Sequence, residues 1–277
     1  MLSCPKFLLV PALLFTVCLF ALCAATPITA SAQVVHSEQV QIGPPLLRTV
    51  DPPAKDATVA ELDARGDQLR MMKLYLDALD YYRAALAKQR DSSQLMNKIG
   101  ITELMMQRYR EAKKSFEQSI KADRKFADAY NNLGVVMYEG RRYGAAIKEY
   151  RRAIAIDATS ASFFSNLGAA LFSKKQFDAA VTAYQRALEI DPNVFARTSR
   201  GGVQAQLPSP EDRAHYDYTV AKLYAKMGFS DQSLEYLRKA MEEGYKDFND
   251  VYKDVEFAQL RKDKRFAELV ATKTPTL

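Results

Sequence analysis

The sequence predicts an all-α fold that is built as an array of helix hairpins. Residues 131–150, NNLGVVMYEGRRYGAAIKEY, return in similar form at 165–184 as SNLGAALFSKKQFDAAVTAY, 34 positions later. Within each copy the large apolar residues recur every three or four positions, which is typical of one face of a helix. A composition with no Trp and only 11 Gly among 277 residues also favours helices. Hairpins that cannot bury their apolar faces alone stack into a solenoid.

Residues 1–32 predict a secretory signal peptide. A lone Lys6 precedes the apolar stretch 7–25, and Ala30 and Ala32 occupy the small-residue positions before a cleavage ahead of Gln33. We therefore expect an exported chain, periplasmic or secreted, that is cleaved near Ala32. The alternative is an N-terminal membrane anchor that stays uncleaved, because the apolar stretch is nearly long enough to span a bilayer.

Two further features of the N-terminal region limit the chemistry of the mature chain. All three cysteines, Cys4, Cys18 and Cys23, lie within the predicted signal peptide, so cleavage leaves no disulfide, thiol nucleophile or cysteine ligand. Residues 33–57 contain four prolines in two pairs and no helical period. Proline removes a backbone donor and favours extended neighbours, so this segment is predicted to be a flexible linker.

Residues 58–194 carry four contiguous blocks of 34 residues, at 59–92, 93–126, 127–160 and 161–194. Each block has a glycine in its first half and, in its second half, an alanine followed four residues later by a large aromatic residue. These columns are Gly66, Gly100, Gly134 and Gly168; Ala78, Ala112, Ala146 and Ala180; and Tyr82, Phe116, Tyr150 and Tyr184. Small residues allow the two helices of a block to approach closely, so each block is predicted to form one hairpin.

The blocks resemble tetratricopeptide repeats in their length, in the Leu-Gly pairs at 133–134 and 167–168, in the alanine of the second helix, and in the terminal Asp191-Pro192. The resemblance implies a right-handed solenoid of about five hairpins. Residues 195–213 hold Gly201-Gly202 and two prolines and are predicted to be an inserted loop. A fifth, degenerate hairpin is expected at 214–247, and residues 248–277 are expected to cap the array with one or two short helices.

The sequence offers no constellation that is typical of catalysis. It contains no phosphate-binding glycine loop, no HExxH motif and no GxSxG motif. The two histidines, His36 and His215, are far apart in the sequence, and the carboxylates occur singly on predicted exposed faces. We therefore expect a protein that is not an enzyme and that has no metal or other cofactor.

Family resemblance implies that ligands bind to the concave surface formed by the first helix of each hairpin. That surface is drawn from the second, fifth, sixth, ninth, twelfth and thirteenth residues of a block, which we call the inner-face positions. The predicted protein-binding residues are Asn97, Lys98, Ile101, Asn131, Asn132, Val135, Tyr138, Asn166, Ala169 and Phe172. Asn132 and Asn166 would hold the main chain of an extended peptide, because an amide both donates and accepts hydrogen bonds. Alternatively, these amides contact neighbouring helices.

Charge at the two ends of the array suggests a polarity for such a ligand. Asp63 and Asp67 stand where some family members place a clamp for a peptide carboxylate, so a clamp of that kind is disfavoured. Together with Asp128, these acids favour a basic ligand segment at one end, whereas Lys222 and Lys226 make the far end basic. The net charge of +6 is expected to be spread along the helices rather than gathered in a block, which favours a solvated surface over a nucleic-acid site.

The sequence therefore predicts an exported, non-enzymatic scaffold that binds a peptide or protein partner of unknown identity in its concave groove. No nucleic-acid partner is expected, a membrane is expected only if the N-terminal segment stays uncleaved, and the oligomeric state is open. Two alternatives remain. The chain is an assembly or envelope-organising protein that self-associates, or it is an accessory subunit of an envelope enzyme complex.

Overall fold

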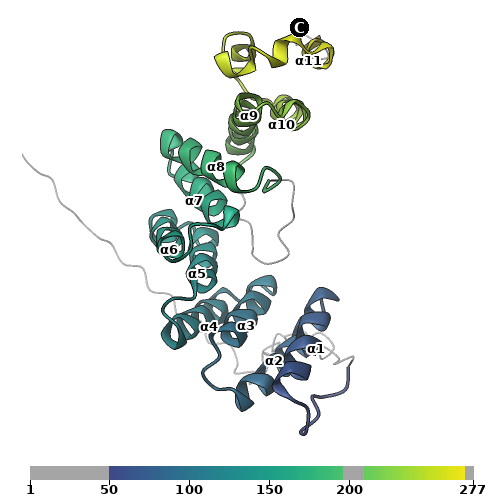
Figure 1. The fold of residues 1–277 in the computed structure, drawn as a ribbon, viewed down its shortest axis with the longest axis vertical. Helices are drawn as coiled ribbons and strands as arrows, with labels where there is room; N and C mark the ends of the chain where they lie inside the picture. Colours follow the sequence, from purple (N-terminus) through teal and green to yellow (C-terminus); the bar gives the residue numbers. More distant parts are fainter. Residues whose placement is uncertain (1–49, 196–206, 208, 272–277) are drawn as a thin grey trace, which may run out of the picture. The chain divides into compact units, whose positions relative to one another are not determined.

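The computed structural model describes residues 50–195, 207 and 209–271, all within one compact unit that spans Arg48–Leu277. The predicted signal peptide, most of the linker and most of the 195–213 insertion lie outside the described residues. The described part is all-α, without strands, which confirms the predicted fold class. Its helices follow one another as consecutive hairpins (Figure 1).

Each of the four blocks contains two helices, a first helix of 13 residues and a second of 14. The hairpins are α1 (Val59–Met71) with α2 (Tyr75–Lys88), α3 (Ser93–Met105) with α4 (Tyr109–Ala122), α5 (Ala127–Glu139) with α6 (Tyr143–Ile156), and α7 (Ala161–Ser173) with α8 (Phe177–Ile190). The second helix of one hairpin packs on the first helix of the next, as α2 does on α3, α4 on α5 and α6 on α7. The first helices also contact each other directly, α3 with α5 and α5 with α7.

The turn inside each hairpin uses the same backbone geometry. Lys73, Gln107, Arg141 and Lys175, which are spaced by 34 residues, all have positive φ angles of 55° to 63°. The residue after each donates its N–H to the carbonyl five positions back, as Leu74 does to Leu69 at 2.9 Å. This bond closes a Schellman-type helix end. The turn therefore repeats with the block, although none of the four positions is glycine.

The glycine column brings the two helices of a hairpin into contact. A Cβ placed on Gly134 would lie 2.5 Å from the ring of Tyr150, and a Cβ on Gly66 would lie 2.6 Å from the ring of Tyr82. Real Cβ atoms do not approach an aromatic ring so closely. The aromatic side chain of the second helix is fully buried because the first helix has no side chain at the point of contact.

The fifth hairpin consists of α9 (Pro210–Lys226) and α10 (Ser230–Glu242). Helix α9 begins at Pro210, with Ser209 as its cap, and Gly228 supplies the positive φ of the turn. After it come three 3₁₀ segments, η1 (Phe248–Tyr252), η2 (Val255–Phe257) and η3 (Leu260–Lys262), and the short helix α11 (Lys264–Ala271), which contacts α10. The apolar residues of this segment, among them Phe257, Leu260 and Phe266, are buried against the last hairpin.

Replacing Gly134 with Ala tests the close contact in the hairpin. The new methyl group would force the Tyr150 ring or helix α5 to shift, which we expect to lower the free energy of unfolding by about 1–3 kcal/mol. Gly144 on α6 is the matched control, because its Cβ would meet only the end of the Lys174 side chain at 3.9 Å. Gly144→Ala should stabilise the chain by about 0.5–1 kcal/mol through helix propensity. Urea denaturation followed by circular dichroism measures both. Equal effects of the two substitutions would contradict the steric argument.

Candidate functional site

The inner-face positions of neighbouring hairpins are joined by polar contacts at a constant offset of 35 residues. Lys98 donates to Asp63 at 2.7 Å, Asn132 donates to Asn97 at 3.0 Å, and Asn166 donates to Asn131 at 2.9 Å. In each case the sixth residue of a block binds the fifth residue of the block before it. These inter-repeat contacts link α1 to α3, α3 to α5 and α5 to α7.

The four asparagines form one continuous chain of hydrogen bonds. Asn131 donates to its neighbour Asn132 at 3.2 Å, so the direction runs from Asn166 through Asn131 and Asn132 to Asn97. All four side chains are buried. A buried amide without a partner costs about 1–3 kcal/mol. The amide chain therefore fixes the register of α3, α5 and α7, which is the second of the two roles that the sequence left open for Asn132 and Asn166.

At the first junction an ionic cluster replaces the amides. Lys98 on α3 donates to both oxygens of Asp63 and, at 2.7 Å, to Asp67 on α1, which also accepts from the Tyr82 hydroxyl at 2.7 Å. Burial alone would raise the pKa of Asp67, but the hydrogen bonds from Lys98 and Tyr82 hold that pKa below its usual range. Asp63 and Asp67, two of the three acids expected to attract a basic ligand, are therefore already paired within the chain.

One of the two lysines of the predicted basic end is paired as well. Lys222 lies 3.0 Å from Asp254 and 3.5 Å from Glu256, which belong to the C-terminal segment. Lys226 remains exposed, with a 3.5 Å contact to Gln185. Internal ion pairs thus neutralise Asp63, Asp67 and Lys222, which weakens the proposed polarity of the array.

The two aromatic residues among the predicted binding residues contact both their own hairpin and the next one. The ring centres of Tyr138 and Tyr143 are 5.2 Å apart, and the Tyr138 hydroxyl is 3.0 Å from the Ser173 hydroxyl on α7. Burial raises the pKa of Tyr138 to about 12. Phe172 contacts the rings of Phe177 and His215, both at 4.9 Å. These aromatic side chains stabilise the junctions to the next hairpin.

Of the ten predicted binding residues, nine are buried and only Lys98 is partly exposed. The buried nine are Asn97, Ile101, Asn131, Asn132, Val135, Tyr138, Asn166, Ala169 and Phe172. No bound ligand tests their role, so ligand binding by these residues stays a prediction. The exposed large apolar side chains of the inner face are Met71 at the end of α1, which is 81% exposed, and Met105 at the end of α3, which is 45% exposed.

Three features were missed at the sequence level. The hydroxyls of Tyr150 and Tyr184 are buried without a hydrogen-bond partner in the described part of the chain, and burial raises the pKa of both tyrosines well above the usual value. On α9, burial and nearby Glu243 raise the pKa of Asp217 to about 7. The 35-residue offset of polar residues was the available signal for the inter-repeat contacts, whereas burial of single groups left no pattern in the sequence.

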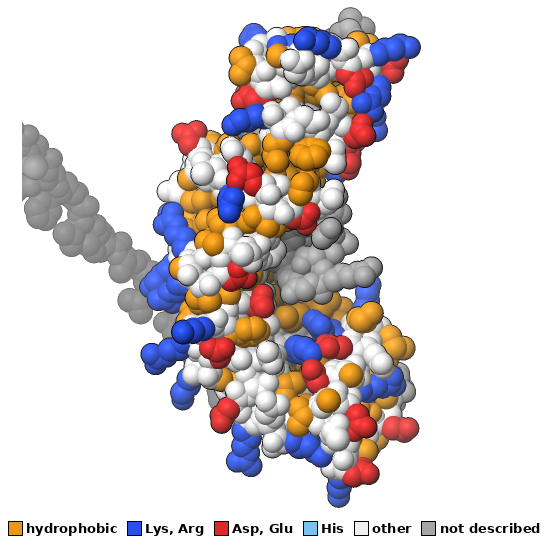
Figure 2. All heavy atoms as spheres, viewed as in Figure 1, with side chains coloured by type: hydrophobic (Ala, Val, Ile, Leu, Met, Phe, Trp, Pro, Cys, Tyr) orange, Lys and Arg blue, Asp and Glu red, His pale blue; other side chains and the backbone are white. Residues whose placement is uncertain are grey.

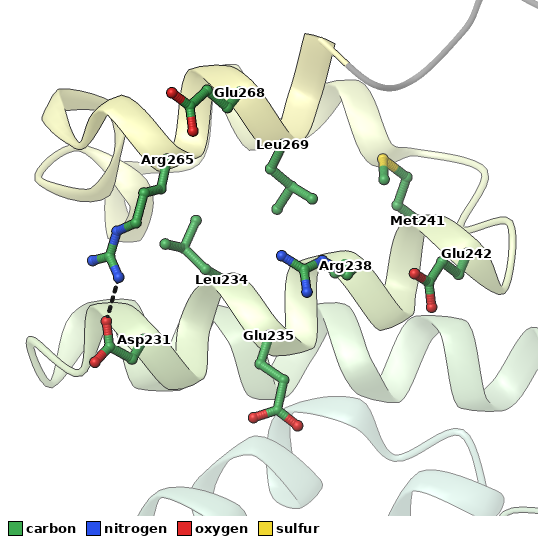
Figure 3. A pocket seen from close by; sticks show the side chains of 9 residues that line it. All are labelled: Asp231, Leu234, Glu235, Arg238, Met241, Glu242, Arg265, Glu268 and Leu269. Carbon is green, nitrogen blue, oxygen red and sulfur yellow. Dashed lines mark hydrogen bonds and ion pairs between the residues drawn. The ribbon is translucent and has the colours of Figure 1, made fainter.

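Two grooves lie on other parts of the unit. One, of about 510 Å³, lies between α10 and α11 (Figure 3) and has Leu234, Met241 and Leu269 between charged side chains. An ion pair of 2.7 Å from Arg265 to Asp231 closes one end of it. The other, of about 800 Å³, is lined by residues of α4, α5 and α6 and by Arg124. Neither groove was predicted, because each is formed by helices from different parts of the sequence.

The described residues contain no group of three or more His, Cys, Asp or Glu side chains placed to hold a metal ion. Nor does any helix in 50–195 or 209–271 combine the length and the apolar character needed to cross a membrane.

Comparison with known proteins agrees with the repeat architecture. Family models described as tetratricopeptide repeat match residues 97–161 and 161–194. Residues 97–194 of this chain are tetratricopeptide repeats. The repeats that match are those joined by the asparagine chain, and the first and fifth hairpins extend the same architecture beyond the matched residues.

Among solved structures, PilF from Pseudomonas aeruginosa matches with a TM-score of 0.52 at 16% identity, over 79% of this chain and 89% of that one. MamA from Desulfovibrio magneticus RS-1 has a TM-score of 0.48 at 16% identity, over 69% and 97% of the two chains. YrrB, described as a TPR protein with an unusual peptide-binding site, has a TM-score of 0.45 at 20% identity, over 67% and 86%. Identity at this level reflects the shared fold alone. No curated protein matches the chain.

Replacing Asn132 with Ala tests the asparagine chain. The change removes one link and leaves the buried amides of Asn97 and Asn131 each short of a partner, so we expect the free energy of unfolding to fall by about 1–3 kcal/mol. Asn249→Ala is the control, because Asn249 is exposed, and it should change stability by less than about 0.5 kcal/mol. Chemical denaturation measures both variants, and a neutral Asn132→Ala would show that the amides do not fix the register.

Proposed function

We propose that this chain is a non-enzymatic scaffold that binds a peptide or protein partner along the inner face of its tetratricopeptide repeats. The observation that carries the proposal is the pair Met71 and Met105, which are the last residues of α1 and α3 and remain exposed at equivalent positions. Met71 follows Asp63 and Asp67 at four-residue intervals, and so continues the stripe of the ionic cluster along α1.

The chemistry of this exposed part suits a partner segment of mixed character. Methionine side chains are flexible and polarisable and adapt to different apolar surfaces. Lys98 and its two carboxylates lie beside them, with side chains that are 25% to 35% exposed. Because rigid helices hold these groups, little ordering is required when a ligand binds. The other predicted binding residues would serve this function by holding α3, α5 and α7 in register.

Substituting the two methionines tests the inner face. Peptides selected from a random displayed library against residues 33–277 should lose affinity by about tenfold or more when Met71→Asp and Met105→Asp are combined, because two charges replace apolar contacts. Tyr252→Asp with Val255→Asp is the matched control, since both of these residues are exposed apolar side chains outside the first helices. Fluorescence anisotropy measures the affinities. Peptides that bind the Met71→Asp/Met105→Asp variant with unchanged affinity would count against inner-face binding, as would a library that yields no ligand.

We propose further that the chain is exported, on the basis of the apolar segment and the small residues before Gln33. Expressed with its full N-terminus in a Gram-negative host, the protein should accumulate outside the cytoplasm and begin at Gln33, as measured by fractionation and N-terminal sequencing. Deletion of residues 2–32 should leave it in the cytoplasm. An intact N-terminus in the membrane fraction would support the anchored alternative.

A further inference from the structure

The positive charge of the chain is concentrated in its middle. Between residues 108 and 152 there are twelve Lys and Arg against six Asp and Glu, a net charge of +6, which equals the net charge of all 277 residues. Two of the twelve are in ion pairs, Lys113 with Glu117 and Arg152 with Glu149. The other ten form no ion pair with any carboxylate of residues 50–195, 207 and 209–271.

The fold gathers many of these side chains on the second helices of two consecutive hairpins. Lys114 and Lys121 on α4 and Lys148, Arg151 and Arg152 on α6 are all exposed. Figure 2 shows Lys and Arg side chains along the edge of the unit where Figure 1 places α4 and α6. The basic residues, which are dispersed in the sequence, thus form one surface.

An apolar groove lies within this surface, and we call it the outer groove. Helices α4 and α6 form its walls, with Ile120 and Ile156 among their lining residues, and α5 lines it with Tyr130, Leu133 and Met137. These α5 residues follow helical spacing and lie opposite the inner-face positions. Ile156 is 39% exposed, whereas Leu133 and Met137 are buried at the base.

The charged residues that line the outer groove are three cations and two carboxylates. Lys121, Arg124 and Arg152 line it together with Glu117 and Glu149. Both carboxylates are already paired, Glu117 with Lys113 at 2.6 Å and Glu149 with Arg152 at 3.0 Å. Lys121 and Arg124 therefore keep their charge available beside an apolar floor.

We propose that the outer groove is a docking site for an acidic amphipathic helix of a partner protein. Apolar residues on one face of such a helix would cover Leu133, Met137 and Ile156. Its flanking Asp and Glu residues would pair with Lys121 and Arg124. This is a helix-in-groove contact, in which packing supplies affinity and charge selects the partner. The site is separate from the inner face, since it uses the opposite side of α5.

A protein helix fits these features better than an anionic membrane does. Membrane-surface binding requires apolar side chains that protrude into the acyl region. Here Leu133 and Met137 on α5 lie at the bottom of the groove, under a tenth exposed, with the basic residues above them. A concave apolar floor with a charged rim is suited to receiving a ridge of side chains from another helix.

A displayed library of helical peptides about 18 residues long tests the proposal, with Leu fixed at i, i+3, i+4 and i+7 and the other positions drawn from acidic, basic and neutral residues. Selection against residues 33–277 should enrich Asp and Glu at the variable positions. The enriched peptides should bind Lys121→Glu/Arg124→Glu at least about tenfold more weakly, and binding should weaken as salt is added. Fluorescence anisotropy measures affinity, and circular dichroism checks that each variant is folded.

Lys262→Glu/Lys264→Glu is the matched control, since it makes the same change in net charge on exposed residues of the C-terminal segment. This control should retain the affinity, as should the Met71→Asp/Met105→Asp variant of the inner face. If Lys121→Glu/Arg124→Glu and Lys262→Glu/Lys264→Glu lost affinity equally, the effect would come from net charge alone, and the proposal would be overturned. Enrichment of neutral or basic peptides would also overturn it. The proposal would also be overturned if no acidic peptide bound and the chain instead bound phosphatidylglycerol vesicles in a way that depends on Lys121 and Arg124. Self-association through Ile156, measured by light scattering, would overturn it as well.

Discussion

The structure depends on the contact between a glycine of the first helix and an aromatic ring of the second helix in each hairpin. At Gly134 and Tyr150 the two helices approach so closely that no Cβ could be accommodated. This contact sets the separation of the helices within a hairpin, and its repetition every 34 residues makes successive hairpins equivalent. Equivalent hairpins stack with equivalent surfaces, which allows one core to continue from the second hairpin to the C-terminal segment.

Stacking leaves the relative register of the hairpins to be set by polar side chains. The sixth residue of one block binds the fifth residue of the preceding block, through an ion pair at Lys98 and Asp63 and through amides at Asn132 and Asn166. An amide pair and an ion pair thus occupy equivalent positions at successive junctions between repeats. Repeated asparagines at inner-face positions therefore have a structural explanation that is independent of any ligand.

Partners can bind to the side chains that are not used in the contacts between repeats. On the inner face this includes the ends of α1 and α3, with their two exposed methionines. On the opposite side of α5 it is the outer groove, where an apolar floor accompanies ten cations of residues 108–152 that form no ion pair with the described carboxylates. Two surfaces of different chemistry on one array would allow a scaffold to hold two partners at once.

The sequence by itself determined the helical hairpins, their period and the columns of glycine, alanine and aromatic residues, because these depend on local periodicity and on contacts within a block. It also identified which residues occupy the inner-face positions. Only the tertiary structure decided that Asn97, Asn131, Asn132 and Asn166 bind one another and that Asp63 is paired with Lys98, since these contacts join different repeats. The same applies to the basic surface and the outer groove. Burial and charge pairing depend on which helices become neighbours, and a position within a repeat does not specify that.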